Sequence, residues 1–76
     1  MNKMPVISAK DFYSYLIKYG CVHVSNESSH FKVQYPPTGK CMSVPIHGNK
    51  DISRGFMKTI LTKLGIDVDD FIGSIR

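Results

Sequence analysis

The chain has few cysteines, few acidic residues and no long apolar run. Its two cysteines, Cys21 and Cys41, form no CxxC pair. The simplest interpretation is two small buried thiols in a reducing cytosol, although a disulfide between them stays open. No stretch approaches the ~18 apolar residues of a membrane span, and no signal-peptide pattern opens the chain. We therefore expect a cytoplasmic protein that does not use a membrane.

Basic residues outnumber the acidic ones in this short chain. Ten Lys and Arg against six Asp and Glu give a net charge of +4 and a sequence pI of about 9.2. A basic balance favours acidic partners such as nucleic acid. Hydrophobic residues make up 42% of the chain and charged residues 21%, which is typical of a compact folded protein. We expect one domain over residues 1–76.

Two stretches carry apolar residues at helical spacing between start and stop signals. Ser8 and Gly20 bracket the first, which predicts a helix over residues 9–19. Ser53 and Gly65 bracket the second. The expected buried faces consist of Ala9, Phe12, Tyr15, Leu16 and Tyr19 in the first helix and Phe56, Met57, Ile60, Leu61 and Leu64 in the second. Residues 67–72 predict one further helical turn with acids at its start.

Three stretches between the helices alternate apolar and polar residues, namely 21–25, 30–35 and 41–46. A period of two with one apolar face predicts a half-buried antiparallel sheet. The order is α-β-β-β-α. The expected fold is therefore α+β, with two helices on one face of a three-stranded antiparallel sheet.

The alternation also assigns side chains to the two faces of the sheet. We expect Val22 and Val24 on the apolar face of the first strand. His30, Lys32 and Gln34 share the polar face of the second strand, where solvent or a partner can reach them. Pro45 predicts that the third strand ends there or lies at the sheet edge.

Several short motifs in this order resemble the HicA family of toxins. They are Pro5-Val6-Ile7-Ser8, Ser29-His30, Val44-Pro45-Ile46-His47-Gly48 and the helical stretch 58–66. The resemblance implies a double-stranded-RNA-binding-domain-like fold, ribonuclease activity against mRNA and an antitoxin partner of the HicB kind. It also implies that His30 is the catalytic histidine. The family's glycine before Ser29 is Ser28 here, which alters the loop if that glycine needs a positive φ.

His30 is the residue best suited to chemistry on RNA. Histidine can give or take a proton near neutral pH, which is the help that a 2′-hydroxyl needs to attack its own phosphate. His23 is interpreted as a surface residue. His47 is interpreted as a residue that orders its loop, and a contact with phosphate stays open for it. No group of Asp, Glu, His and Cys has metal-site spacing. We therefore expect cleavage without a metal or small-molecule cofactor, leaving a 2′,3′-cyclic phosphate.

Basic residues cluster at the start of the second helix. Lys50, Arg54 and Lys58 are expected to hold phosphates there, together with the helix N-terminus. Ser29 and Lys32 beside His30 complete the expected RNA contacts. Two alternatives stay open: an RNA-binding module of the same fold in which His30 is structural, and an adaptor whose basic face meets an acidic protein.

Overall fold

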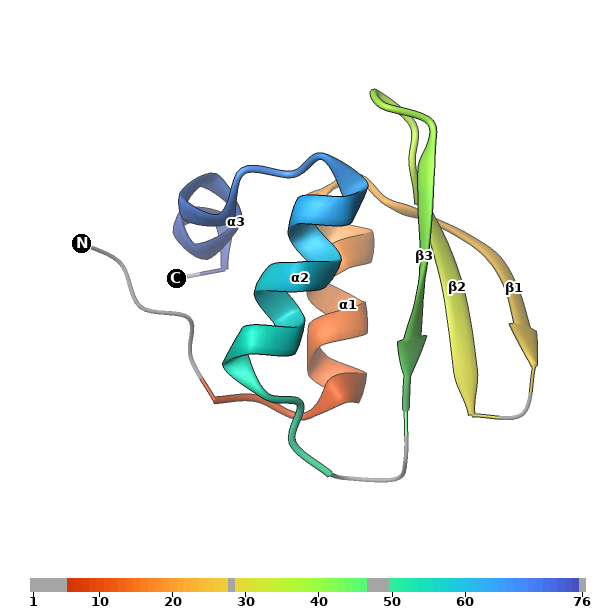
Figure 1. The fold of residues 1–76 in the computed structure, drawn as a ribbon, viewed down its shortest axis with the longest axis vertical. Coiled ribbons are helices and arrows are strands. Elements are labelled where there is room, and N and C mark those ends of the chain that lie inside the picture. Colours follow the sequence, from red (N-terminus) through yellow and green to blue (C-terminus); the bar gives the residue numbers. More distant parts are fainter. Residues whose placement is uncertain (1–5, 28, 47–49, 76) are drawn as a thin grey trace.

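The fold has the predicted α+β layout, and the further helical turn expected over residues 67–72 is present as a short third helix. A computed structural model describes residues 6–27, 29–46 and 50–75. The element order is α1 (Ala9–Tyr19), β1 (Val22–Glu27), β2 (His30–Tyr35), β3 (Lys40–Pro45), α2 (Arg54–Leu64) and α3 (Val68–Ser74). The sheet forms one layer, α1 and α2 cover one of its faces, and α3 lies on the far side of these helices (Figure 1).

The predicted helix signals act as capping groups. The Asp11 N–H donates to Ser8 Oγ at 3.1 Å, and the Phe56 N–H donates to Ser53 Oγ at 3.2 Å. Each bond satisfies an N–H that the helix itself leaves without a carbonyl partner. Gly20 and Gly65 end the two helices with φ values of 132° and 82°. Both predicted helices therefore begin and end where the sequence indicates.

A short backbone pairing joins the starts of α1 and α2. The Ala9 N–H donates to the Lys50 carbonyl and the Ile52 N–H donates to the Ile7 carbonyl, both at 3.1 Å. The two helices consequently begin side by side and run in the same direction (Figure 1). The sequence pattern did not predict this pairing, since neither segment reads as a strand.

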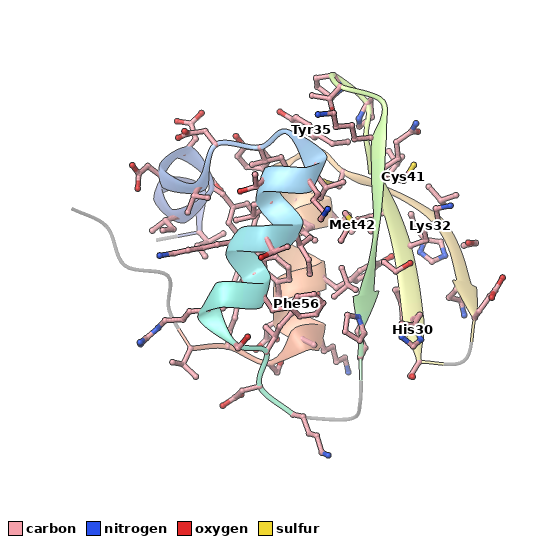
Figure 2. The ribbon with its side chains drawn as sticks, viewed as in Figure 1. His30, Lys32, Tyr35, Cys41, Met42 and Phe56 are labelled. Carbon is pink, nitrogen blue, oxygen red and sulfur yellow. The ribbon has the colours of Figure 1, made fainter. Side chains whose placement is uncertain are left out.

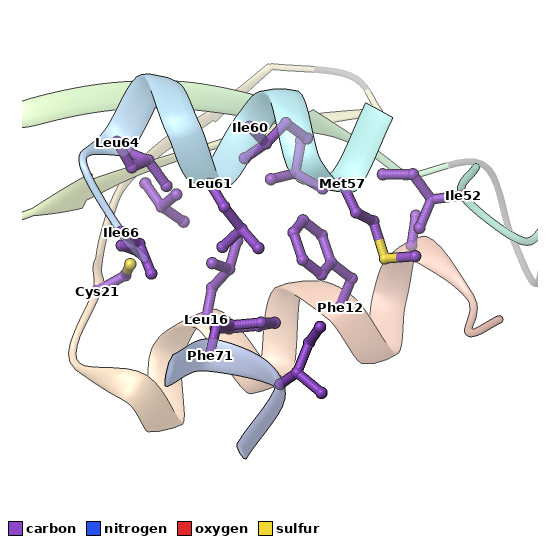
Figure 3. Close-up of a cluster of buried hydrophobic side chains, with 14 residues drawn as sticks. Phe12, Leu16, Cys21, Ile52, Met57, Ile60, Leu61, Leu64, Ile66 and Phe71 are labelled. Carbon is purple, nitrogen blue, oxygen red and sulfur yellow. The ribbon is translucent and has the colours of Figure 1, made fainter. Parts of the chain in front are cut away.

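The sheet is antiparallel throughout, with strand order β1-β2-β3. Val33 from β2 and Val44 from β3 are fully buried under the helices. The core joins them to apolar side chains of all three helices and the intervening segments, several of which are labelled in Figure 3: Phe12, Leu16, Cys21, Ile52, Met57, Ile60, Leu61, Leu64, Ile66 and Phe71. Pro45 is the last residue of an edge strand, as predicted.

The predicted face assignment in β1 is wrong. Val22 and Val24 were expected on the apolar face, but they are 46% and 47% exposed. The strand also continues to Glu27 and carries a bulge between His23 and Ser25. A bulge inserts one extra residue and shifts the alternation of faces. Val22 precedes the bulge and pairs with Gln34, and His23 pairs with Val33. The more apolar residues at the start of this strand therefore face away from the helices, and the bulge changes the faces of the residues after it.

Two further expectations from the apolar pattern need correction. Phe56 was placed on the buried arc of α2, yet it is 39% exposed beside the start of that helix. Cys41 was interpreted as buried but is exposed, whereas Cys21 is buried, and neither is in a disulfide. Burial raises the pKa of the Cys21 thiol to about 11. Cys21 is therefore an un-ionised core residue at neutral pH.

The helix α3 closes the core on the side away from the sheet. Phe71 and Ile72 are fully buried. The Phe71 ring packs edge-on against Phe12, with centroids 5.6 Å apart, and against Tyr19, with centroids 5.5 Å apart. No helix within the described part of the chain combines the length and the apolar character needed to cross a membrane.

Gly65 is expected to be the least replaceable glycine of the fold. Its φ of 82° is left-handed, and a Cβ there would lie 2.7 Å from Thr38 Cγ2. The Thr38 hydroxyl holds its own position by donating to the Leu64 carbonyl at 2.6 Å. We predict that Gly65→Ala lowers the free energy of unfolding in urea by about 1–2 kcal/mol for the backbone and on the order of 1 kcal/mol more for the clash.

A Thr38→Ser background separates the two contributions. Serine keeps the hydroxyl and removes the methyl group that the new Cβ at position 65 would meet. Gly65→Ala should therefore be less destabilising in this background than in the wild type. Equal losses in both backgrounds would contradict the assigned clash.

Candidate functional site

The face of the sheet turned away from the helices carries a small grid of polar side chains. Residues paired across neighbouring strands point to the same face. Glu27 pairs with His30, and His30 pairs with Pro45. In the next row of this face, Ser25 pairs with Lys32, and Lys32 pairs with Ser43. We call this surface the open face, defined by Ser25, Glu27, His30, Lys32, Ser43 and Pro45.

Five of these residues line one hollow of about 230 Å³: Ser25, Glu27, His30, Lys32 and Ser43. The hollow combines an imidazole, a carboxyl group, an ammonium group and two hydroxyls. His30 and Lys32 are both exposed on β2, and Figure 2 shows β3 between them and α2. The predicted placement of these two residues on the polar face of β2 is therefore confirmed.

The bulge in β1 decides which residues face His30 and Lys32. Without it, alternation from the Val22–Gln34 pair would place Asn26 opposite His30 and Val24 opposite Lys32. The register shift between His23 and Ser25 replaces them with Glu27 and Ser25. Bulges frequently redirect side chains beside active sites. The bulge therefore places the carboxylate of Glu27 instead of the amide of Asn26 opposite His30, and the hydroxyl of Ser25 instead of the apolar Val24 opposite Lys32.

Backbone pairing holds the start of β2 in place. The Ile46 N–H donates to the Ser29 carbonyl at 2.6 Å, which extends the β2–β3 ladder beyond the paired strands. Ser29 itself is half-buried next to His30. This contact fixes the backbone from which the His30 side chain projects. Ser28, which stands where the family glycine is expected, lies outside the described residues.

The predicted basic residues separate into two groups. Lys32 lines the hollow beside His30, whereas Lys50, Arg54 and Lys58 are exposed on or before α2, in the helical layer. None of these three belongs to the described lining of the open-face hollow. Lys50 lines a second hollow of about 190 Å³, which also includes Phe56 and Pro45. Pro45 is the cross-strand partner of His30, so the edge strand β3 separates the two hollows.

His23 has a different environment from His30. Its Nδ1 lies 2.7 Å from the Tyr13 hydroxyl, and both rings pack against Phe31. Burial raises the pKa of the Tyr13 hydroxyl, so this group stays protonated at neutral pH. His23 pairs with Val33 and therefore belongs to the helix-facing side. Its interpretation as a surface residue is confirmed, because the side chain is exposed, although it lies on the face of β1 beside Tyr13 of α1 rather than on the face that carries His30. His47 lies outside the described residues.

The remaining acids do not gather into a metal site. Asp67 is the N-cap of α3, where its Oδ2 accepts from the Asp70 N–H at 3.0 Å. Asp69 and Asp70 occupy the first turn of the helix, which confirms their interpretation as helix acids. Within the described ranges, no three His, Cys, Asp or Glu side chains are close enough to share a metal ion.

Sequence reasoning missed Glu27, Ser25 and Ser43 as parts of the site. Glu27 and Ser25 reach the open face only because of the bulge. The residue types of β1 do not predict that bulge. Ser43 could have been found, because it alternates with Met42 and Val44 on a regular strand.

The chain matches a known protein family over most of its length. The family model described as "HicA toxin of bacterial toxin-antitoxin" matches residues 9–66. This range includes α1, the whole sheet, α2 and every residue of both hollows, while α3 follows it. A search of curated proteins found no match to the chain.

Proposed function

Because the chain belongs to the HicA family and is thus a toxin of a bacterial toxin–antitoxin system, we propose that it cleaves mRNA with His30 and is neutralised by an antitoxin of the HicB kind. The observation that carries this proposal is the position of His30. The imidazole is exposed on the open face, in a hollow that also contains Lys32. A phosphodiester in this hollow meets a proton-transfer group and a positive charge together.

Each of these two groups can assist one part of the reaction. The 2′-hydroxyl attacks the adjacent phosphorus, and the bond to the 5′-oxygen breaks. Histidine can take the first proton or supply the second, since its unperturbed pKa is about 6.5. Lys32 lines the same hollow, and a positive charge there offsets the negative charge that builds on the phosphate oxygens. The step forms a 2′,3′-cyclic phosphate and a free 5′-hydroxyl and requires no metal ion.

Growth arrest tests the function directly. Induction of the wild-type chain in a bacterial host should stop growth, whereas His30→Ala should not. Co-expression of the antitoxin should restore growth to cells that carry the wild type. Arrest by the His30→Ala variant, together with RNA that is retained but uncut, would favour the non-catalytic RNA-binding module instead.

The basic residues near α2 are proposed to bind the RNA backbone rather than to act at the cleaved bond. Lys50, Arg54 and Lys58 are exposed and lie one layer away from the open-face hollow. Phosphate contacts position a nucleic acid without reading its sequence. Ser29 and Lys32 are proposed as the contacts closest to the cleaved phosphate. An RNA strand that passes around the β3 edge would touch both groups.

Removing two of these charges should flatten the salt dependence of RNA binding. We predict that Lys50→Ala combined with Lys58→Ala reduces the slope of log K against log salt by about 1.4, because each lost contact with a single strand removes about 0.7. Filter binding from low to moderate salt measures the slope. Lys10→Ala with Lys18→Ala, two exposed lysines of α1, makes the matched control with the same net charge. Equal slopes for the two double variants would contradict the assignment.

A further inference from the structure

Cleavage of RNA in one step transfers two protons at two different oxygens. One proton leaves the attacking 2′-oxygen and another reaches the departing 5′-oxygen. A single imidazole cannot be base and acid in the same step, so a second group is needed on the opposite side of the phosphorus. The lining of the open-face hollow contains three titratable side chains, Glu27, His30 and Lys32.

We infer that Glu27 is the second catalytic residue: it takes the proton from the 2′-hydroxyl, and His30 in its charged form donates to the 5′-oxygen. This inference rests on the proposed ribonuclease function and assigns the direction of proton transfer within it. Glu27 is the direct cross-strand partner of His30 on the open face. Such partners have Cβ atoms about 4.5–5.5 Å apart, which leaves room for a phosphate to contact both side chains.

The charges favour this division of roles. A carboxylate has only acceptor oxygens and an ammonium group has only donors, and Glu27 and Lys32 bring these two groups to the hollow one row apart. An imidazolium can donate a proton to a leaving oxygen, and His30 is the only imidazole in the described lining of this hollow. The new bond joins the 2′-oxygen to phosphorus, the bond from phosphorus to the 5′-oxygen breaks, and the two protons balance.

The bulge in β1 provides an independent reason to single out Glu27. The register shift between His23 and Ser25 brings Glu27 to the open face, where regular pairing would bring Asn26. Asn26 instead pairs with Phe31, whose ring packs against Tyr13 under α1. The bulge thus places a carboxylate, which can accept a proton, at the position on β1 that pairs with His30.

The leaving group distinguishes the two roles. The substrate is an RNA oligonucleotide in which sulfur replaces the bridging 5′-oxygen. The 5′-sulfur departs without protonation, because a thiolate is a stable leaving group. Single-turnover rates of the purified full chain should be measured on the oxygen and sulfur substrates. Glu27→Gln should lose about 10²–10⁴-fold on both substrates. His30→Ala should lose a similar factor on the oxygen substrate and recover most of it on the sulfur substrate.

Two variants control for placement. Asn26→Ala alters the neighbour of Glu27 that faces the helices and should cleave at the wild-type rate. The exchange Asn26→Glu with Glu27→Asn moves the carboxylate to the helix-facing side and should be as slow as Glu27→Gln. Recovery of activity by this exchange would overturn the register on which the inference rests.

The outcomes separate this inference from the proposed function. Wild-type cleavage by Glu27→Gln, with His30→Ala inactive, would refute the role of Glu27 and leave the ribonuclease intact. Rescue of Glu27→Gln rather than His30→Ala by the sulfur substrate would reverse the two roles and refute the assignment. Wild-type cleavage by His30→Ala would refute the proposed function itself.

Discussion

Replacing His30 with alanine is expected to slow RNA cleavage by the purified protein by about 10²–10⁴-fold, the usual contribution of a positioned acid or base. The loss should appear in the rate at saturating protein, while RNA affinity changes little. Lys32 and the basic residues near α2 are unchanged in this variant and still face solvent. Single-turnover cleavage and filter binding on the same oligonucleotide separate the two quantities.

His23 provides a matched control for this substitution. It lies on the neighbouring strand but faces the helices, where its Nδ1 is 2.7 Å from the Tyr13 hydroxyl. His23→Ala should therefore reduce stability and leave the cleavage rate of the folded protein within a few-fold of the wild type. Equal loss of cleavage in the His30→Ala and His23→Ala variants would contradict the location of the catalytic site on the open face.

Truncating Phe71 to alanine is expected to have the largest effect on stability. Its ring is fully buried and contacts Phe12 and Tyr19 edge-on. Loss of a buried aromatic ring leaves a cavity and lowers the free energy of unfolding by about 3–5 kcal/mol. A chain of 76 residues has roughly 4–11 kcal/mol in total, at about 0.05–0.15 kcal/mol per residue. The variant should therefore lose a large share of the stability of the fold and unfold at a much lower urea concentration.

Urea denaturation followed by circular dichroism measures this change. Val6→Ala is the control, because Val6 is apolar but largely exposed, and it should alter stability by no more than about 0.5 kcal/mol. The result also tests whether α3, which follows the residues matched by the family, is an integral part of the fold. A loss below about 1 kcal/mol for Phe71→Ala would mean that α3 packs only loosely.

Local rules predict most of the fold. Ser8, Ser53, Gly20 and Gly65 mark helix ends through bonds to nearby backbone groups, and such signals can be read without knowing the rest of the structure. The regular alternation in β2 and β3 likewise placed His30 and Lys32 on the exposed face. These features depend on neighbours within a few residues.

The remaining features depend on contacts between distant segments. The bulge after His23 changes which β1 residues face His30, and it can be recognised only from the pairing of β1 with β2. The backbone hydrogen bond from Ala9 to Lys50 links two segments whose sequences do not predict a strand. For the same reason, composition grouped Lys50, Arg54 and Lys58 with His30, although the sheet lies between their layer and the open-face hollow.

The ends of the cleaved RNA test the central claim most directly. Purified protein should be incubated with mRNA in excess EDTA, and the product ends identified by mass spectrometry. We predict 2′,3′-cyclic phosphate and 5′-hydroxyl ends from the wild type at an undiminished rate, and no such ends from His30→Ala. Cleavage that requires Mg²⁺ and leaves 5′-phosphate ends, or identical products from both proteins, would contradict the assignment of His30 as the catalytic residue.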